Sequence, residues 1–477
     1  MRKFLGLALL LMLTTAGFTQ SKKGELGPLR LSSSSFKAGI SDGDSLLLIA
    51  FSQDNKRHYH SFTADGIKRW TATHRSKRLV KDQLLGTLQN DNDFLLFSAP
   101  QEKENELEVV RVNKHENDLK VEELDLAKGK TRILTSIQVR DRLVVIVHNR
   151  KSKEIGAILA QSSGDVSYLP LTYTEKDMAL FLKGDFVTVN EQEPLGFKSL
   201  IQTKKAYPLT PDEFLLVADP FGRNDQGSIR VFNLDLESRT LKMRTIRNEE
   251  TLISGVVRTY YHDKVLYRFI NTDSRLSLTL YNQYGGFIRK YAYGADDDFQ
   301  LANSRVYRSG GVGILGFDRI DGELKKTRKI LRFTAQGLPF IKVETRKDSL
   351  IELTIGAYQY NTEDEVLKDH VTWETIDGMP VMGFDPFMGT VVGTIDKTQI
   401  TSFKTILSPE YELTKQTTEM SEPQDLLKRF IDRQKGELGL VMTFPHTPYH
   451  RYLILENEKE GVSVLYTIRK EYFKNFK

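Results

Sequence analysis

Cysteine is absent from the 477-residue sequence, and tryptophan occurs only at Trp70 and Trp373. Without cysteine the chain has no disulfides, no thiolate metal ligands and no cysteine nucleophile. It also has no cysteine to which a lipid could be attached. A chain of this length can bury a core large enough to fold without disulfides, even in an oxidising compartment.

Long apolar runs are missing as well, and the one short run near the start has the form of a secretory signal. Arg2 and Lys3 precede the apolar segment 4–13, and small residues follow at Gly17 and Thr19. This pattern predicts a signal peptide over 1–19, cleaved before Gln20, and one domain over 20–477. The alternative is a membrane anchor, but the run has about half of the roughly 20 residues that a spanning helix needs. We expect export to the periplasm or the extracellular space.

The sequence has no strong excess of one charge. It contains 68 Lys and Arg against 63 Asp and Glu, a formal net charge of +5, and removing Arg2 and Lys3 leaves 66 against 63, or +3. No basic tract is long enough to indicate nucleic acid or anionic lipid as a partner.

The segment 44–70 shows the pattern that dominates the rest of the chain. The apolar run SLLLIAFS is short and bounded by polar residues, which favours a buried strand over a helix. The β-prone run HYHSFT follows, and Asp65-Gly66 is a hairpin signal before IKRW. Such a small meander cannot bury both of its faces alone, so it must pack against neighbours of the same kind.

Variants of this unit recur to the end of the chain. Their turns fall near residues 66, 117, 164, 237, 285, 337, 396 and 461, and several intervals are close to 50 residues. Repeats of this length with about four strands each predict an all-β fold, a single closed β-propeller of eight blades, with seven as the alternative. We expect the segment 29–36 to complete the last blade, one helix over 422–435, and Gly66 and Gly337 in hairpin turns that require glycine.

The turns FTADGI, YNQYGGF and FTAQGLPF share an aromatic residue, polar residues, Gly and then an apolar residue. They resemble the last hairpin of the blades in WD40-like, TolB-like and quinoprotein-type propellers. The Gly-His and Trp-Asp pairs of true WD40 repeats are missing. The repeating tryptophans of quinoprotein propellers are missing too, which argues against a quinone, and we expect no cofactor. Because propellers serve both as enzymes and as scaffolds, the resemblance implies a fold and no activity.

Few residues suggest chemistry. His58 and His60 share one face of a strand, but no third metal ligand is evident nearby. His446 and His450 lie among prolines, which excludes the helical zinc motif. The acidic run 296–298 lacks the alternating spacing of a calcium loop, and the related segments DPFG at 219–222 and DPFMG at 385–389 read as turns. No nucleophile elbow or phosphate loop is present, so we predict no catalytic residue and no metal site.

The connections between strands differ in character. The Gly-containing turns are short and alike, whereas the connections that precede them vary from unit to unit. In propellers such variable connections emerge on one face, and loops on a rigid scaffold commonly carry binding groups. We therefore predict a binding rim, with Arg and Tyr as anchors, formed by Asp54, Lys56, Arg57, Arg223, Asn224, Asp225, Asp273, Arg275, Asp318, Tyr358, Tyr360 and His446.

Two functions are compatible with these observations. The first is an exported, non-enzymatic propeller that binds a protein, peptide or glycan through this face. The second is an extracytoplasmic hydrolase or lyase whose acidic and basic residues meet at the central channel. Paired carboxylates contributed by distant segments would not be recognisable in the sequence.

Overall fold

The computed structural model covers the whole chain. The residues that it describes are 22–27, 37–42, 45–53, 56–63, 66–75, 82–100, 106–125, 131–139, 141–149, 151–174, 182, 186–189, 200–219, 228–247, 256–310, 322–359, 371–376, 379–384, 399–418, 438–443, 450–457 and 462–469.

Nearly all of the regular structure is antiparallel sheet. Three sheets have four sequential strands in the first third of the chain: β2 (Lys37–Asp42), β3 (Leu46–Gln53), β4 (Lys56–Thr63) and β5 (Lys68–Arg75); β6 (Asp82–Gln89), β7 (Asp93–Pro100), β8 (Glu106–Asn113) and β9 (Leu119–Asp125); and β10 (Thr131–Val139), β11 (Arg142–Asn149), β12 (Ile155–Gln161) and β13 (Val166–Pro170).

The middle of the chain forms two further sheets. The first contains β16 (Lys204–Pro208), β17 (Glu213–Ala218), β18 (Ile229–Asp235) and β19 (Thr240–Ile246), with the two-residue strands β14 (Thr172–Tyr173) and β15 (Val187–Thr188) added in parallel at its two edges. The second contains β20 (Val256–His262), β21 (Val265–Asn271), β22 (Arg275–Asn282) and β23 (Phe287–Gly294).

In the last part of the chain, the order of strands within a sheet departs from their order in the sequence. One sheet has the order β25-β24-β30-β27-β26, from β24 (Tyr307–Gly310), β25 (Gly322–Glu323), β26 (Leu338–Thr345), β27 (Ile351–Gln359) and β30 (Gln399–Leu407). Another has the order β1-β33-β32-β31, from β1 (Lys22–Gly27), β31 (Leu438–Thr443), β32 (His450–Asn457) and β33 (Val462–Arg469). β28 (Val371–Ile376) and β29 (Met379–Phe384) form a two-stranded sheet.

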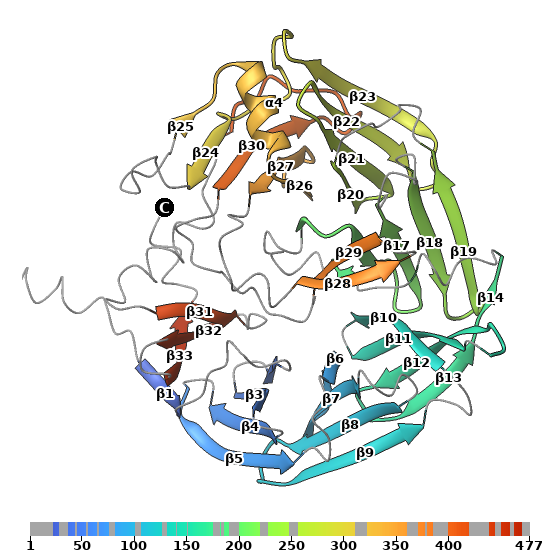
Figure 1. Ribbon diagram of the computed structural model, residues 1–477, viewed down its shortest axis with the longest axis vertical. Coiled ribbons are helices and arrows are strands. Elements are labelled where there is room, and N and C mark those ends of the chain that lie inside the picture. Colours follow the sequence, from blue (N-terminus) through green and yellow to red (C-terminus); the bar gives the residue numbers. More distant parts are fainter. Residues whose placement is uncertain are drawn as a thin grey trace, which may run out of the picture.

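The larger sheets succeed one another around a common centre, which is the arrangement of a β-propeller (Figure 1). The second strand of several sheets is buried on both faces; every residue of β21 is buried, whereas the outer strand β5 alternates between exposed and half-buried. The apolar core accordingly lies between consecutive sheets. One cluster joins residues of β3 to residues of β7 and β8, and another joins β11 to β17 and β18. The second strand of a sheet is covered on both faces, so it appears in the sequence as a continuous apolar run, as in β11 and β21.

Arginines connect neighbouring sheets at their outer hairpin turns. Arg69 of β5 donates to the Lys114 carbonyl at 3.2 Å, and Arg111 of β8 donates to the Gly164 carbonyl at 3.3 Å. Arg244 of β19 donates in the same way to the Gln283 carbonyl at 2.9 Å. In each case the accepting carbonyl lies in the turn before the outer strand of the next sheet, so these contacts fix the position of consecutive sheets relative to each other.

The two ends of the chain meet in one sheet, as the sequence predicted. β1 pairs antiparallel with β33, with Lys22 opposite Tyr466. The pairing segment is 22–27, whereas the expected segment 29–36 lies outside the described residues. Adding an N-terminal strand to a C-terminal sheet satisfies the backbone groups of both chain ends.

The segment 325–337 corrects one expectation. The sequence predicts a hairpin turn at Gly337, but the residues before it, Thr327–Ala335, form the helix α4. Its buried residues Thr327, Ile330, Leu331 and Thr334 recur at helical spacing and pack on β21, β26, β27 and β30. Gly337 therefore follows a helix and closes no hairpin, whereas Gly66 has the expected positive φ of 81° in the turn between β4 and β5.

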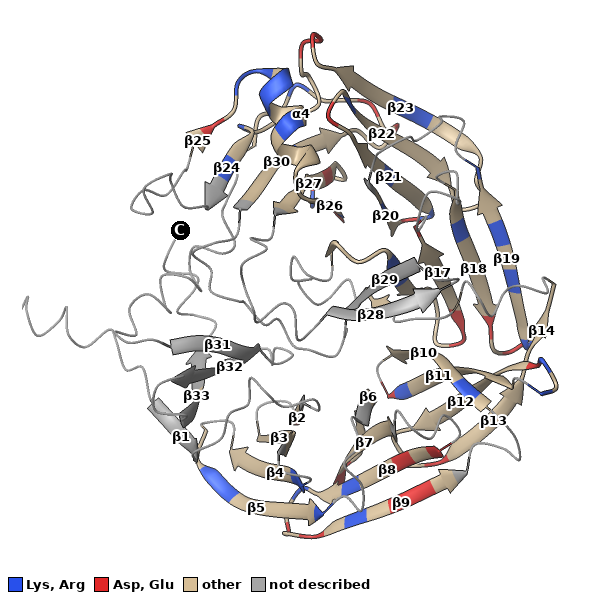
Figure 2. Ribbon diagram, in the orientation of Figure 1, with Lys and Arg blue, Asp and Glu red and all other residues tan. Residues whose placement is uncertain are grey.

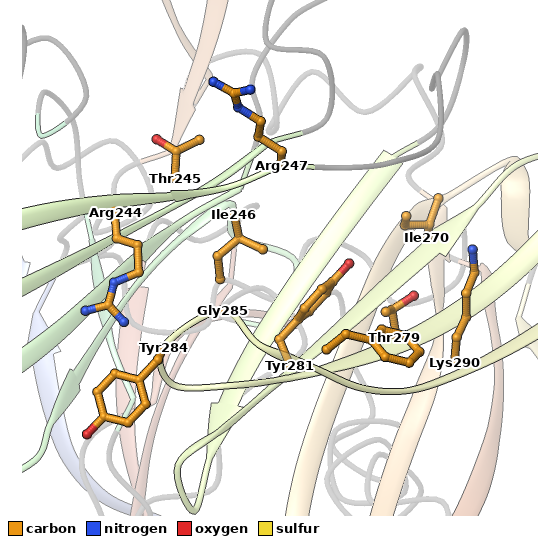
Figure 3. A pocket seen from close by; sticks show the side chains of 11 residues that line it. Arg244, Thr245, Ile246, Arg247, Ile270, Thr279, Tyr281, Tyr284, Gly285 and Lys290 are labelled. Carbon is orange, nitrogen blue, oxygen red and sulfur yellow. The ribbon is translucent and has the colours of Figure 1, made fainter.

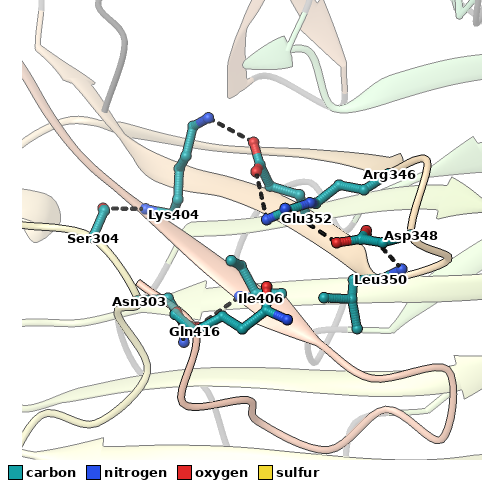
Figure 4. Close-up of polar contacts among 9 residues, drawn as sticks. All are labelled: Asn303, Ser304, Arg346, Asp348, Leu350, Glu352, Lys404, Ile406 and Gln416. Carbon is teal, nitrogen blue, oxygen red and sulfur yellow. Dashed lines mark hydrogen bonds and ion pairs between the residues drawn. The ribbon is translucent and has the colours of Figure 1, made fainter. Parts of the chain in front are cut away.

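Side-chain bonds hold the sheet that contains β30 to the segments around it (Figure 4). The Asn303 amide donates to the carbonyls of Thr414 and Gln416, and its oxygen accepts from the Ile406 amide at 2.7 Å. On the same sheet Glu352 forms an ion pair with Lys404 at 2.6 Å. The Asn303 contacts join residues more than 100 positions apart in the sequence.

The all-β, propeller-type architecture predicted from the repeats is confirmed. The described residues form seven sheets of four or more strands and one of two strands, so the count of eight blades stays a prediction. The helix expected over 422–435 lies outside the described residues. Within the described part of the chain, no helix is both long enough and apolar enough to cross a membrane.

Candidate functional site

The structure describes five of the twelve residues of the predicted rim. Lys56, Asp273 and Arg275 are exposed. Arg57 lies inside β4 with 2% of its surface exposed and forms an ion pair with Glu108, and Tyr358 lies inside β27 with 7% exposed. Both were expected in surface connections, so that expectation was wrong for these two. The remaining residues are outside the described part: Asp54, Arg223, Asn224, Asp225, Asp318, Tyr360 and His446. Whether the rim binds a ligand stays a prediction.

The residues considered as metal ligands have other contacts. His60 is buried and stacks on Phe51, and its Nδ1 lies 3.3 Å from the Thr71 hydroxyl. Asp297 accepts a hydrogen bond from the Gly294 amide at 2.6 Å, and Asp296 pairs with Arg328 at 2.8 Å. Among the residues that the structure describes, no three His, Asp or Glu side chains are grouped so that they could hold a metal ion.

A cluster of buried charges lies between the inner strands of two consecutive sheets. Asp219, which follows β17, is 4% exposed, and its Oδ2 accepts a hydrogen bond from the Thr259 amide of β20 at 2.9 Å. Lys205 of β16 donates to the carbonyls of Gln202 at 2.6 Å and Thr259 at 3.3 Å. Arg258 donates to the Ile201 and Val257 carbonyls. These side chains bond to backbone, which is a structural role.

Burial lowers the pKa of Lys205 to about 8; nearby Asp219 acts in the opposite direction, and Arg258 lowers it further. A lysine in this state resembles a catalytic base, but its bonds to two backbone carbonyls explain its position without a substrate. The buried charges therefore give no support to a catalytic site at the centre.

A pocket of about 440 Å³ lies between the outer strands of the same two sheets (Figure 3). β19 and the residue that follows it form one wall, and the β22–β23 hairpin forms the other. It is lined by Arg244, Thr245, Ile246, Arg247, Ile270, Thr279, Tyr281, Tyr284, Gly285, Phe287 and Lys290. Three of these are cations and none is a carboxylate.

The lining of the pocket divides into an apolar floor and a basic, aromatic margin. Ile246 and Ile270 are 5% and 4% exposed. Tyr284 and Phe287 are 70% and 65% exposed, although large apolar side chains of this kind are usually covered. Arg244 and Tyr284 lie at one end of the pocket and Lys290 at the other (Figure 3).

Local geometry keeps the pocket open at the turn. Gly285 has a φ of 87°, which the turn requires, and a Cβ at this position would lie 3.1 Å from Ile246. Arg244 is held by its bond to the Gln283 carbonyl, and its guanidinium lies 5.5 Å from the centre of the Tyr284 ring. Arg244 is thus held in place by contacts within the protein, which lowers the entropic cost of using it to bind a ligand.

Charge on the outer strands is uneven along the chain (Figure 2). β19 carries Lys242 and Arg244 and is followed by Arg247, whereas β9 carries Glu122 and Glu123. A cationic, partly aromatic pocket of this kind can bind an anionic group together with an apolar one.

This pocket was not predicted from the sequence, because the predicted rim was placed on the variable connections between strands. The pocket lies beside a short Gly turn, at the opposite end of the β22–β23 pair from Asp273 and Arg275. A signal was present: basic residues in TLKMRTIR and aromatic residues on both sides of the glycines in YNQYGGF. What the sequence did not show is that residues some 40 positions apart face each other across two sheets.

No family model matches the sequence, and the curated proteins gave no match either. Among solved structures, the WD40 domain of SCAP from fission yeast aligns with 92% of this chain and 83% of its own, at 9% identity and a TM-score of 0.32. A europium-containing methanol dehydrogenase aligns with 94% and 83%, at 9% identity and a TM-score of 0.31. AofleA from Arthrobotrys oligospora aligns with 72% and 84%, at 10% identity and a TM-score of 0.28. These scores are low, so the propeller assignment rests on the sheets of this chain.

Proposed function

We propose that this protein is an exported, non-enzymatic β-propeller that binds a protein, peptide or glycan carrying negative charge. The observation that carries the proposal is the pocket between β19 and the β22–β23 hairpin, where cations and exposed aromatic rings surround an apolar floor. Charged groups at the margin of such a pocket steer an anionic ligand, and the buried apolar contact supplies affinity.

The proposal includes the organisation of the chain. Residues 1–19 are the signal peptide, and 20–477 form one closed propeller in the periplasm or outside the cell. The propeller has eight blades, with seven as the alternative, which would match the seven sheets of four or more strands among the described residues. The pairing of β1 with β33 supports closure of the ring. The predicted rim around Lys56, Asp273 and Arg275 is the second candidate for the ligand site.

The test is calorimetric titration of the mature chain with poly-L-glutamate and polygalacturonate, and with neutral dextran as the uncharged comparison. Arg247→Ala combined with Lys290→Ala should weaken binding of the anionic polymers about ten-fold, a change of about 1.4 kcal/mol. Binding should also weaken as salt is raised, because exposed charges are screened.

The matched control is Arg75→Ala combined with Lys120→Ala, which removes one exposed arginine and one exposed lysine from the outer strands β5 and β9. This variant should bind like the wild type. Equal losses in both variants, or no binding of either anionic polymer, would overturn the proposal. Loss of binding only on replacing Lys56 and Arg275 would move the site to the rim.

A further inference from the structure

We infer that the pocket receives an acidic polypeptide segment in extended conformation, which adds as a strand to the outer edge of β19. This inference rests on the proposed function and names the class of ligand. It comes from three features: the pairing of β14 with β19, the apolar floor of the pocket and the distribution of charge around it.

The outer edge of β19 already accepts a short parallel strand. Thr172 and Tyr173 of β14 lie opposite Thr240 and Leu241, and the Thr172 amide donates to the Arg239 carbonyl at 2.8 Å. β14 ends there, while β19 continues to Ile246, and in the described part of the chain no other strand pairs with this edge. The geometry needed for a parallel partner is therefore present on a strand of which the described residues cover only Thr240 and Leu241 at this edge.

The direction of the backbone groups agrees with strand addition. In a strand, the backbone N–H and C=O of alternate residues point to the same edge. The backbone N–H and C=O of Met243 and Thr245 therefore lie on the same edge of β19 as the Arg239 carbonyl, which accepts a hydrogen bond from the Thr172 amide. A peptide that continues the line of β14 would bond to these groups. Alternate side chains of that peptide would then fall on the same face as Arg244 and Ile246, which line the pocket.

The floor of the pocket selects an apolar side chain. Ile246, Ile270 and Thr279 are each no more than 5% exposed. The hydroxyl groups of a sugar ring would lose water against the two isoleucines without gaining partners, whereas a leucine or similar side chain gains burial. The aromatic rings of Tyr284 and Phe287 extend this apolar surface outward.

The charges around the floor select acidic neighbours for that side chain. Arg244 and Lys290 lie at opposite ends of the pocket (Figure 3), Arg247 adds a third cation, and no carboxylate lines it. The fit is thus an extended segment with one apolar residue between Asp or Glu residues. Its main chain pairs with β19 and its carboxylates lie near the cations.

The experiment uses a short synthetic peptide with one leucine between acidic residues, titrated into the mature chain by fluorescence anisotropy. A second peptide has the same side chains but methyl groups on alternate backbone nitrogens, and a third has glycine in place of leucine. We expect the first to bind, and each of the other two to bind at least about ten-fold more weakly, because backbone donors or apolar burial are lost. Arg247→Ala with Lys290→Ala should weaken the first peptide, and Arg75→Ala with Lys120→Ala should not.

The outcomes separate this inference from the proposed function. If polygalacturonate binds at the pocket and the acidic peptide does not, the pocket is a glycan site and the inference is wrong while the proposed function stands. If the methylated peptide binds as well as the first, strand addition is wrong. If neither polymer nor peptide binds, both proposals are wrong.

Discussion

The surroundings of His60 disfavour the protonated, positively charged form of its imidazole ring. Its side chain is 3% exposed, its ring is stacked between Phe51 and Phe62, and Lys68 and His58 are close enough to repel a proton. Burial is the main cause that lowers the pKa of His60 to about 3, from an ordinary value of 6.5. The residue that sequence reasoning weighed as a metal ligand is therefore a neutral member of the core.

This environment predicts loss of stability in acid. The unfolded chain gains a proton on His60 near pH 6.5, whereas the folded chain does so only near pH 3. The stabilising contribution is thus complete above pH 6.5 and declines as the pH falls toward 3, by about 1.4 kcal/mol per pH unit. His60→Phe removes this decline while it keeps an aromatic ring in the stack.

Urea unfolding at about pH 7 and about pH 5 measures the difference. The wild type should lose about 2 kcal/mol more than His60→Phe between these two conditions. His115→Gln, which changes an exposed histidine, should follow the wild type. Parallel losses for wild type and His60→Phe would contradict the assignment.

Gly66 and Gly322 differ in what they require of the backbone. Gly66 has a φ of 81°, which costs an L-residue about 1–2 kcal/mol, whereas Gly322 has no such φ and a Cβ there would meet nothing within 4 Å. We expect Gly66→Ala to lower the free energy of unfolding by about 1 kcal/mol or more, and Gly322→Ala to change it little. Thermal melting of the two variants decides this; equal melting temperatures would be inconsistent with the turn geometry.

At the scale of elements, the strands were the easiest features to predict. Runs such as RLVVIVHN are apolar on both faces because β11 packs between two sheets, and the sequence shows this directly. The helix over 327–335 was not predicted, because the apolar residues at 330, 331 and 333 are too few to distinguish a short helix from a strand. Arg57 was read as a loop residue because its neighbours are polar, although its ion pair with Glu108 lets it be buried in β4.

The candidate site was predicted less well than the fold. Its wall residues 244–247 and 281–290 come from two sheets, and each stretch alone has the composition of an ordinary outer strand. Only the packing of one sheet on the next brings the basic residues of β19 to the aromatic turn at Tyr284. Contacts of this kind depend on the angle and spacing of sheets, which local sequence pattern does not specify.

Substitution of Asn303 tests how the segment 414–416 is held against the sheet that contains β30. Its amide group makes three hydrogen bonds, to Thr414, Gln416 and Ile406. Asn303→Ala removes all three and leaves a backbone amide and two carbonyls without these partners, so the free energy of unfolding should fall by about 2–3 kcal/mol. Chemical denaturation measures it.

The neighbouring Ser304→Ala serves as the control for Asn303. Its hydroxyl accepts one bond from the Lys404 amide at 2.8 Å and donates one to the Arg305 carbonyl at 3.0 Å. The expected loss is about 1 kcal/mol. If Asn303→Ala costs no more than Ser304→Ala, the Asn303 bonds do not hold this segment.

For the whole molecule, closure of the proposed propeller would depend on the pairing of β1 with β33. β1 is the outer strand of a sheet whose other three strands come from the C-terminal end. Removing residues 1–27 should expose the edge of β33 and lower both the unfolding midpoint in urea and the protection of β33 amides from exchange. Removing only residues 1–21 leaves β1 in place and should change neither. Equal stability of the two truncated chains would show that β1 does not contribute to closure.

We place the ligand site between β19 and the β22–β23 hairpin. Hydrogen–deuterium exchange of the chain 20–477, with and without poly-L-glutamate, is the sharpest test of this placement, because it reports the contact surface without any substitution. We expect slower exchange over 242–247 and 281–290 on addition of the polymer, with no change around Lys56, Asp273 and Arg275. Protection confined to the latter residues, with unchanged exchange at β19, would contradict it.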